Sequence, residues 1–441
     1  MQLLVLTMIF ALLALAFASR FLLSTRAWVN PLTVFNLSQG LLLSAYVLGI
    51  ELEVFNLTIN LQQFALLALG YLSFNVGAIA AVRVFKVKKQ PWQPNISQSQ
   101  NLMIRLSWWV LAAFVFSVAY KFLIIFATYG SVLENIITIR HDYVQGYLNY
   151  GWSNSIAFLS AHVLMLTLGI IEGSRWPAYQ LRGPLLAITF ITVISNDITI
   201  GGANWTFANM CLFALTWAVA RERMHGLKVN KVIGSKAAIG LLVAFSLVTA
   251  LIYVRSEGTL GTNQSIGNVV LFYAGGNIAT FGGYVESQYA SIPSGIRTFG
   301  GLYSIASYVD LLKLPPAANP EDYIFDIGAS SNSNTSISFA NYYVDFGALG
   351  LIVLSGTLGF LTSFALTRSD ARLSIIRMQF LALMLYVCFM SIRGTPTEGK
   401  YFWVLLLLLP ILQALTSRKD NSRRSISRRD PGGAPPELDH G

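Results

Sequence analysis

The sequence predicts an all-α, polytopic integral membrane protein, and two observations carry this prediction. Hydrophobic residues make up 54% of the chain and charged residues only 11%, whereas about a quarter of a soluble domain is charged. Apolar runs near the roughly 20 residues that a helix needs to cross a bilayer also recur along the chain. About eleven such runs are expected to span the membrane. They lie at residues 1–18, 31–50, 61–82, 105–128, 153–173, 184–200, 203–220, 237–254, 342–366, 374–392 and 401–416.

The order of the elements follows from these runs and from what separates them. The first run ends in AFAS, which resembles a signal-peptidase site, but no basic residue precedes it as a secretory signal requires. We therefore expect it to stay as a helix. The sixth and seventh runs are separated by DITIGGANW, in which Asp197, Gly201 and Gly202 predict a tight turn. Residues 1–416 thus form one transmembrane domain, and 417–441 are expected to be a disordered tail.

The distribution of Lys and Arg predicts the orientation of the chain. Short cytoplasmic loops retain basic residues, whereas translocated loops do not. A cytoplasmic C-terminus places most of the 30 basic residues inside, including those of segments 83–89, 221–236 and 418–429. An odd number of spans then leaves the N-terminus outside. The net charge of +10 is therefore explained by topology and by contacts with anionic lipids, and no nucleic-acid partner is expected.

Three external loops are predicted, at about 129–152, 255–341 and 393–400. A structureless loop as long as the second is uncommon. We therefore expect it to contain short helices on the membrane surface, such as residues 266–281, and to pack over the outer mouth of the bundle.

Metal and cofactor motifs are absent from the sequence. It contains no HExxH, Walker, DxD or GxSxG pattern, and both cysteines, Cys211 and Cys388, fall within apolar runs. With four histidines in the whole chain, a dedicated metal site is not expected. A substrate that carries its own good leaving group needs neither metal nor cofactor, because charge stabilisation and a base suffice.

Four arginines lie in the external loops, where basic residues are otherwise depleted. They are Arg140, Arg255, Arg297 and Arg393. One interpretation is that Arg255 and Arg393 cap the outer ends of their helices or pair with a neighbour such as Glu257 or Glu398. The other is that the external arginines converge on an anion, because guanidinium groups suit bidentate recognition of phosphate.

The stretch RHDYVQGYLNYG, residues 140–151, combines an Arg-His-Asp triplet with Tyr143, Tyr147 and Tyr150. This mixture suits a sugar, since polar side chains bond hydroxyl groups and aromatic faces stack on the ring. An aromatic belt at the membrane interface explains the tyrosines as well, but it does not explain the triplet.

Two features resemble a known family. Asn334 and Thr335 are followed by SFANYYVDFGALGL, residues 338–351, where a long external loop enters a span. Arg140 is separated by ten residues from Gly151 in another external loop. Both patterns resemble those of the bacterial oligosaccharide repeat-unit polymerases, the Wzy family, which make O-antigen and exopolysaccharide.

The resemblance implies a glycosyltransferase of the GT-C type at the outer face of the bacterial inner membrane. Such an enzyme moves a growing glycan from its undecaprenyl-pyrophosphate carrier onto the non-reducing end of a lipid-linked repeat unit. Its expected partners are these lipid-linked substrates, the surrounding lipids and a polysaccharide co-polymerase that regulates chain length.

The resemblance also implies roles for individual residues. An acceptor hydroxyl needs a carboxylate or an imidazole to take its proton, and the departing pyrophosphate needs positive charge. The candidate bases are His141, Asp142 and Glu286, and the four external arginines are expected to bind pyrophosphate. The candidate sugar-binding residues are Tyr143, Tyr147, Asn334, Tyr342, Tyr343 and Asp345. Asp345 has an alternative role as the N-terminal cap of its own helix.

Two other functions remain open. An O-antigen ligase shares the lipid-pyrophosphate donor and the architecture, and differs in its acceptor. A flippase for lipid-linked oligosaccharides would also have many spans, but it should have a charged central cavity, and the spans here hold few central charges.

Overall fold

A computed structural model gives the fold. It describes residues 1–23, 25, 27–85, 97–132, 134–174, 182–200, 204–225, 265–286, 295–308, 325–328, 331–333, 337–371, 375–394 and 400–409.

Helices account for nearly all of the described chain. In chain order they are α1 (Gln2–Leu22), α2 (Pro31–Glu51), α3 (Leu61–Val84), α4 (Ser97–Tyr129), α5 (Ile136–Val144), α6 (Trp152–Gly173), α7 (Arg182–Thr199), α8 (Asn204–His225), α11 (Ile266–Glu286), α12 (Ile296–Tyr308), α13 (Ser338–Ala371) and α14 (Ile375–Met390). A further helix covers Lys400–Leu409. Two short antiparallel strands, β1 (Phe325–Gly328) and β2 (Ser331–Ser333), form a hairpin.

The predicted helical membrane protein is confirmed at this level. In the described residues, six helices are long and apolar enough to cross a bilayer, namely α1, α2, α3, α4, α6 and α13, and three shorter apolar helices follow at 183–199, 375–390 and 400–409. Large apolar side chains such as Phe10, Phe21 and Trp109 are exposed on the outside of the bundle, as lipid contact requires. The count of eleven spans stays a prediction, because the span expected at 237–254 lies outside the described residues.

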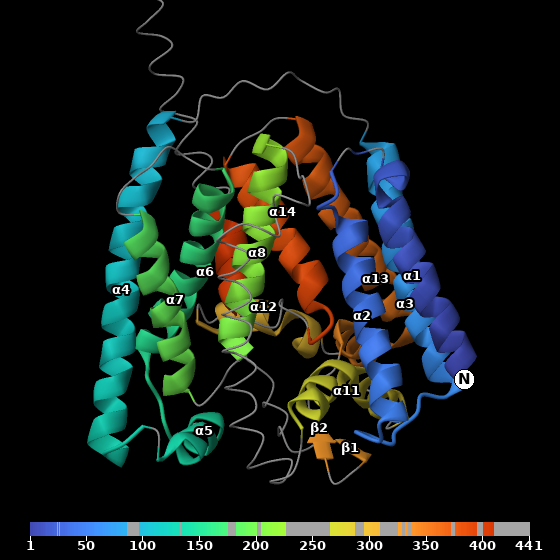
Figure 1. The fold of residues 1–441 in the computed structure, drawn as a ribbon, viewed down its shortest axis with the longest axis horizontal. Helices are drawn as coiled ribbons and strands as arrows, with labels where there is room; N and C mark the ends of the chain where they lie inside the picture. Colours follow the sequence, from blue (N-terminus) through green and yellow to red (C-terminus); the bar gives the residue numbers. More distant parts are fainter. Residues whose placement is uncertain are drawn as a thin grey trace, which may run out of the picture.

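The long helices run side by side, and α5, α11 and the hairpin lie at the same end of the bundle, with α5 near α4 and α7 and with α11 and the hairpin near α2 (Figure 1). We call this the α5 end. It is the end at which the two longer predicted external loops, 129–152 and 255–341, have their described parts. The expected helix at 266–281 is confirmed, and it extends to Glu286 as α11. The tail 417–441 lies outside the described residues.

Polar contacts join the loops at the opposite end. His225, at the end of α8, bonds the carbonyl oxygen of Ser174 at the end of α6, with an N–O distance of 2.8 Å. The Glu222 carboxylate accepts the backbone N–H groups of Trp28 and Val29, at 2.5 and 2.9 Å. The connection between α1 and α2 and the start of the basic loop after α8 therefore lie at the same end, away from α5.

Glycine allows a close helix contact between α3 and α13. A Cβ atom at Gly77 would overlap the carbonyl oxygen of Gly356, and one at Gly359 would overlap the carbonyl oxygen of Phe74. Small residues at such crossings let two backbones approach in a membrane, where dispersion contacts replace the hydrophobic effect between helices. This contact fixes the position of α13, whose first turns enter the candidate site.

Candidate active site

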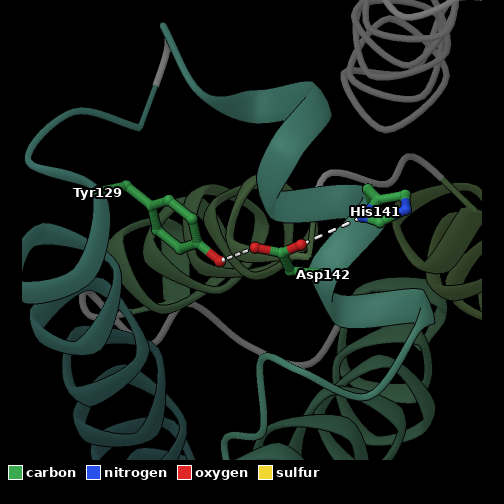
Figure 2. Close-up of polar contacts among 3 residues, drawn as sticks. All are labelled: Tyr129, His141 and Asp142. Carbon is green, nitrogen blue, oxygen red and sulfur yellow. Dashed lines mark hydrogen bonds and ion pairs between the residues drawn. The ribbon is translucent and has the colours of Figure 1, made fainter.

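Helix α5 carries the densest group of predicted site residues, and a side chain of α4 holds it in place. The Tyr129 hydroxyl donates to Oδ2 of Asp142 at 2.7 Å, and Nδ1 of His141 lies 3.1 Å from Oδ1 of the same carboxylate (Figure 2). The hydrogen bond from Tyr129, and then that from His141, lower the pKa of the Asp142 carboxyl below its usual range.

This geometry separates the two candidate bases on α5. A carboxylate with a lowered pKa is a weaker base, so Asp142 is suited to orienting the imidazole. The His141 side chain is 63% exposed, and its Nδ1 already faces Asp142, which leaves Nε2 directed to the surroundings. Imidazole is the commonest general base in enzymes. The pair therefore has the arrangement of a base and its positioning carboxylate.

The tyrosines after Arg140 differ in their surroundings. Tyr147 is 78% exposed and lies near the ring of His141, with centroids 6.5 Å apart. Tyr143 instead packs against Tyr150 in a small apolar cluster under α5. Burial raises the pKa of Tyr143, and the charge of Arg140, one turn earlier on α5, lowers it. Tyr147 keeps an open face for stacking, whereas the ring of Tyr143 is partly enclosed by protein.

A buried lysine under α5 was missed by the sequence analysis. Lys121 of α4 is fully buried, and its ammonium group donates to Oδ1 of Asn154 at 2.7 Å and to Oδ1 of Asn196 at 2.8 Å. It also lies over the rings of Tyr150 and Phe158, about 5 Å from each centroid. Its presence inside the apolar run 105–128 was the available signal, since a charged residue within a span is rare and usually functional.

Asp197 provides the opposite charge to Lys121. The sequence placed it in a turn, but it lies within α7 and is fully buried. Its Oδ2 accepts the backbone N–H of Thr206 at the start of α8, at 2.5 Å, while its Oδ1 has no hydrogen-bond partner among the described residues. The turn prediction is therefore wrong for Asp197, because a short polar motif beside glycines looks the same whether its carboxylate faces solvent or the core; Gly201 and Gly202 lie outside the described residues.

A second group of predicted residues surrounds α11, α12 and the start of α13. Asp345 of α13 is 2% exposed, and its Oδ2 accepts the backbone N–H of Thr298 at 2.7 Å. Thr298 lies in the first turn of α12, so Asp345 caps α12 and not its own helix. The neighbouring Arg297 is attracted to this carboxylate and extends over the ring of Tyr284, 5.1 Å from its centroid.

The rest of the Asp-Phe-Gly stretch shapes the same junction. Phe346 packs against Phe299 at the kink of α12, with centroids 6.3 Å apart. Gly347 has a φ of +67° and interrupts α13, a backbone conformation that glycine adopts without strain. Asp345 therefore caps α12, Phe346 packs against α12, and Gly347 interrupts α13. A pocket of about 480 Å³ lies beside them.

Arg393 belongs to this second group as well. Its guanidinium lies 5.7 Å from the centroid of Tyr273 on α11, and Asn277 donates to the carbonyl oxygen of Ile392 at 3.0 Å. Tyr273 and Tyr284 are eleven residues apart, which is three helical turns, so both project from one face of α11 about 16 Å apart. Arg297 and Arg393 thus approach the same face of one helix from two separate segments.

The remaining predicted residues complete the description. Glu286, at the end of α11, accepts a hydrogen bond from Nε2 of Gln63 at 3.1 Å. Tyr342 is buried beside Phe339, and Tyr343 is half-buried. Arg255 and Asn334 lie outside the described residues. The structure therefore places the described site residues in two groups at the α5 end, one on α5 and one around α11.

Comparisons with known proteins add no assignment. No protein-family model, no curated protein and no solved structure matches this chain. Within the described ranges, no group of three or more His, Cys, Asp or Glu side chains is placed to hold a metal ion.

Proposed function

We propose that this protein is a Wzy-type membrane glycosyltransferase with GT-C-like architecture. It polymerises undecaprenyl-pyrophosphate-linked repeat units into O-antigen, capsular polysaccharide or exopolysaccharide. The observation that carries the proposal is the approach of Arg297 and Arg393 to one face of α11. The two rings are about 16 Å apart along α11, so the arginines reach one pyrophosphate by extending toward each other, and guanidinium groups suit such an anion with several oxygens. Helix α5, which carries the His141–Asp142 pair, lies at the same end of the bundle as α11 (Figure 1), and the pair adds a base.

The proposed reaction is a displacement at the anomeric carbon of the donor glycan. Nε2 of His141 takes the proton of the acceptor hydroxyl while Asp142 stabilises the imidazolium that forms. The acceptor oxygen bonds to the anomeric carbon, and the bond from that carbon to the pyrophosphate oxygen breaks. The electron pair stays with the lipid pyrophosphate, whose charge is stabilised by the arginines. Tyr147, with its exposed ring, is placed to stack on a sugar.

The proposed setting is a bacterial inner membrane, with the C-terminus in the cytoplasm and the α5 end on the periplasmic face. Support comes from the basic loop 221–236, which begins at the end of the bundle opposite α5. Basic loops are retained in the cytoplasm. The proposed partners are the lipid-linked oligosaccharides, membrane lipids and a chain-length-regulating co-polymerase.

Analysis of surface glycans in a deletion strain tests this function. A polymerase defect leaves single repeat units on the final carrier, and the plasmid-borne gene should restore long chains. Complete chains that stay on the lipid carrier would identify a ligase instead. A strain without repeat units outside the inner membrane would identify a flippase.

Arginine variants test the proposed pyrophosphate site. Lysine should substitute poorly, because a compact ammonium group cannot form a bidentate pair. Loss of one such contact typically costs a few kcal/mol, or roughly a hundredfold in rate. At least two of the single Arg→Lys variants should therefore lose most polymer formation at matched abundance. Their double variant should be little worse than the poorer single one, since residues with one shared function are non-additive. The variants are R140K, R255K, R297K and R393K.

A matched control comes from α4. Arg105 is exposed near the start of α4, away from the α5 end, and Arg105→Lys should leave polymer formation unchanged. Near-wild-type polymer from all four site variants would contradict the anion site.

A further inference from the structure

A chain of hydrogen bonds runs from the buried Lys121 to the surface helix α5. The Lys121 ammonium donates to Asn154, and Nδ2 of Asn154 donates to the Tyr143 hydroxyl oxygen at 3.0 Å. An ammonium group has no acceptor, so the Asn154 atom that faces it must be the carbonyl oxygen, which turns the NH₂ group toward Tyr143. Every donor in the chain therefore points outward, from the buried cation to α5.

The last member of this chain keeps a donor of its own. Tyr143 uses an oxygen lone pair to accept from Asn154, and its hydroxyl hydrogen is donated to no residue in the described part of the chain. Hydrogen bonds in series polarise one another, and the effect is larger in a medium of low dielectric constant. A cation at the buried end therefore makes the Tyr143 hydroxyl a stronger donor. Asp197 lies beyond Lys121, and it compensates the buried charge without reversing the direction of the chain.

The polarised hydroxyl lies beside a second positive group. Arg140 precedes Tyr143 by three residues on α5, a spacing that places both on one side of the helix. Its charge acts on Tyr143, and both side chains are partly exposed. A charged donor and a polarised neutral donor next to each other favour an anionic acceptor over a sugar hydroxyl.

We propose that the Tyr143 hydroxyl and Arg140 bind a phosphate group carried by a lipid, and that Lys121 acts as a positioning residue through Asn154. The phosphate belongs either to the pyrophosphate of the lipid-linked substrate, a source that rests on the proposed function, or to a phospholipid of the bilayer. Lys121 touches no ligand in this arrangement. It makes the Tyr143 hydroxyl a stronger donor, and that hydroxyl contacts the phosphate.

A purely structural role for Lys121 makes a different prediction. The same hydrogen bonds join α4, α6 and α7, so loss of the ammonium group would weaken the bundle whatever Tyr143 does. A double-mutant cycle separates the two roles, because a residue that acts through Tyr143 loses its effect on binding once the hydroxyl is removed.

The test uses the purified full-length chain in dodecyl maltoside micelles, which contain no phosphate. Equilibrium binding is measured with tritiated farnesyl diphosphate, and in a second titration with tritiated dihexanoyl phosphatidylglycerol. Tyr143→Phe removes only the hydroxyl and should weaken binding of at least one probe by about tenfold or more, as expected for a hydrogen bond to a charged group. Tyr120→Phe is the matched control, because Tyr120 adjoins Lys121 in sequence but stacks on Trp152 at the bundle surface. It should bind as the wild type does.

The cycle is completed by Lys121→Met. This change should weaken binding severalfold in the wild-type background and hardly at all in the Tyr143→Phe background. If Lys121→Met does not elute as a monodisperse protein, Asn154→Leu provides the same test, because it breaks the chain and leaves Lys121 with Asn196 and Asp197.

The two titrations identify the source of the phosphate. Tyrosine-dependent binding of farnesyl diphosphate supports the substrate pyrophosphate, and tyrosine-dependent binding of phosphatidylglycerol supports a bilayer lipid. Wild-type affinity of Tyr143→Phe for both probes would overturn the proposal. Equal losses on Lys121→Met in both backgrounds would overturn the role of Lys121. Neither readout requires polymer formation, so failure of the polymerase proposal is detected separately, by the glycans of the deletion strain.

Discussion

Asp345 allows the sharpest separation between a structural and a chemical role. It was predicted both as a sugar-binding residue and as a helix cap, and the structure places its carboxylate on the first turn of α12. Asn and Asp are about equally good N-caps, whereas Ala is a poor one. We therefore expect Asp345→Asn to keep α12 and polymer formation largely intact, and Asp345→Ala to loosen α12 and reduce activity by displacing Arg297.

The size of this effect follows from the cap. Replacement of an N-cap by Ala costs about 0.5–2 kcal/mol, and typically about 1. The Asp345 side chain is 2% exposed, so water does not replace the lost acceptor of the Thr298 N–H, which favours the upper part of that range. A loss of about 1.4 kcal/mol in the free energy of local opening corresponds to about tenfold faster amide exchange.

Hydrogen–deuterium exchange of the purified protein, measured on peptides that cover Ile296–Tyr308, provides the assay. Asp345→Ala should accelerate exchange in α12 by about tenfold, and Asp345→Asn by about twofold or less. Exchange in α7, which packs against α4, α6 and α8, provides the internal reference. Unchanged exchange in Asp345→Ala would refute the capping argument. Loss of polymer in Asp345→Asn with normal exchange would show that the carboxylate charge itself takes part in the chemistry.

Three further predictions concern the site and the bundle. Because the pKa of Asp142 is lowered, the hydrogen bonds to its ionised carboxylate stabilise α5 at pH values above the ordinary carboxyl pKa of about 4. This stabilisation is lost as the pH falls through the lowered pKa. Tyr129→Phe should therefore move the carboxyl titration midpoint, followed by ¹³C NMR, upward, and an unmoved midpoint would exclude the tyrosine as its cause. Gly77→Ala should lower the thermal unfolding midpoint in detergent, because the new Cβ meets the Gly356 backbone and such overpacking costs about 1–3 kcal/mol. Gly183→Ala is the control, because its new Cβ meets open space. Equal unfolding midpoints for the two variants would contradict the close crossing of α3 and α13. Polymer formation by the purified protein should persist in excess EDTA, and activity that returns only with added Mg²⁺ or Mn²⁺ would disprove metal-independent chemistry.

The sequence by itself determined the class of the protein and the position of most long helices. An apolar run of about 20 residues has few alternatives to a transmembrane helix, because a bilayer leaves no water to satisfy an open backbone. The runs at 1–18, 31–50, 61–82 and 153–173 accordingly coincide with α1, α2, α3 and α6. The local pattern of RHDY also marked the segment whose His141 and Asp142 side chains meet, because the two residues are adjacent in the chain.

Only the tertiary structure decided which distant residues share a contact. Asp345 was assigned to its own helix as one alternative, yet its acceptor oxygen meets α12, 47 residues earlier. Lys121 finds its partners on α6 and α7, and a lysine inside an apolar run does not reveal which amides will surround it. The physical reason is that apolar periodicity fixes where a helix begins and ends, whereas the pairing of polar groups depends on how each helix is rotated and packed. The close glycine contacts and the enclosed aromatic rings set that rotation and packing in three dimensions.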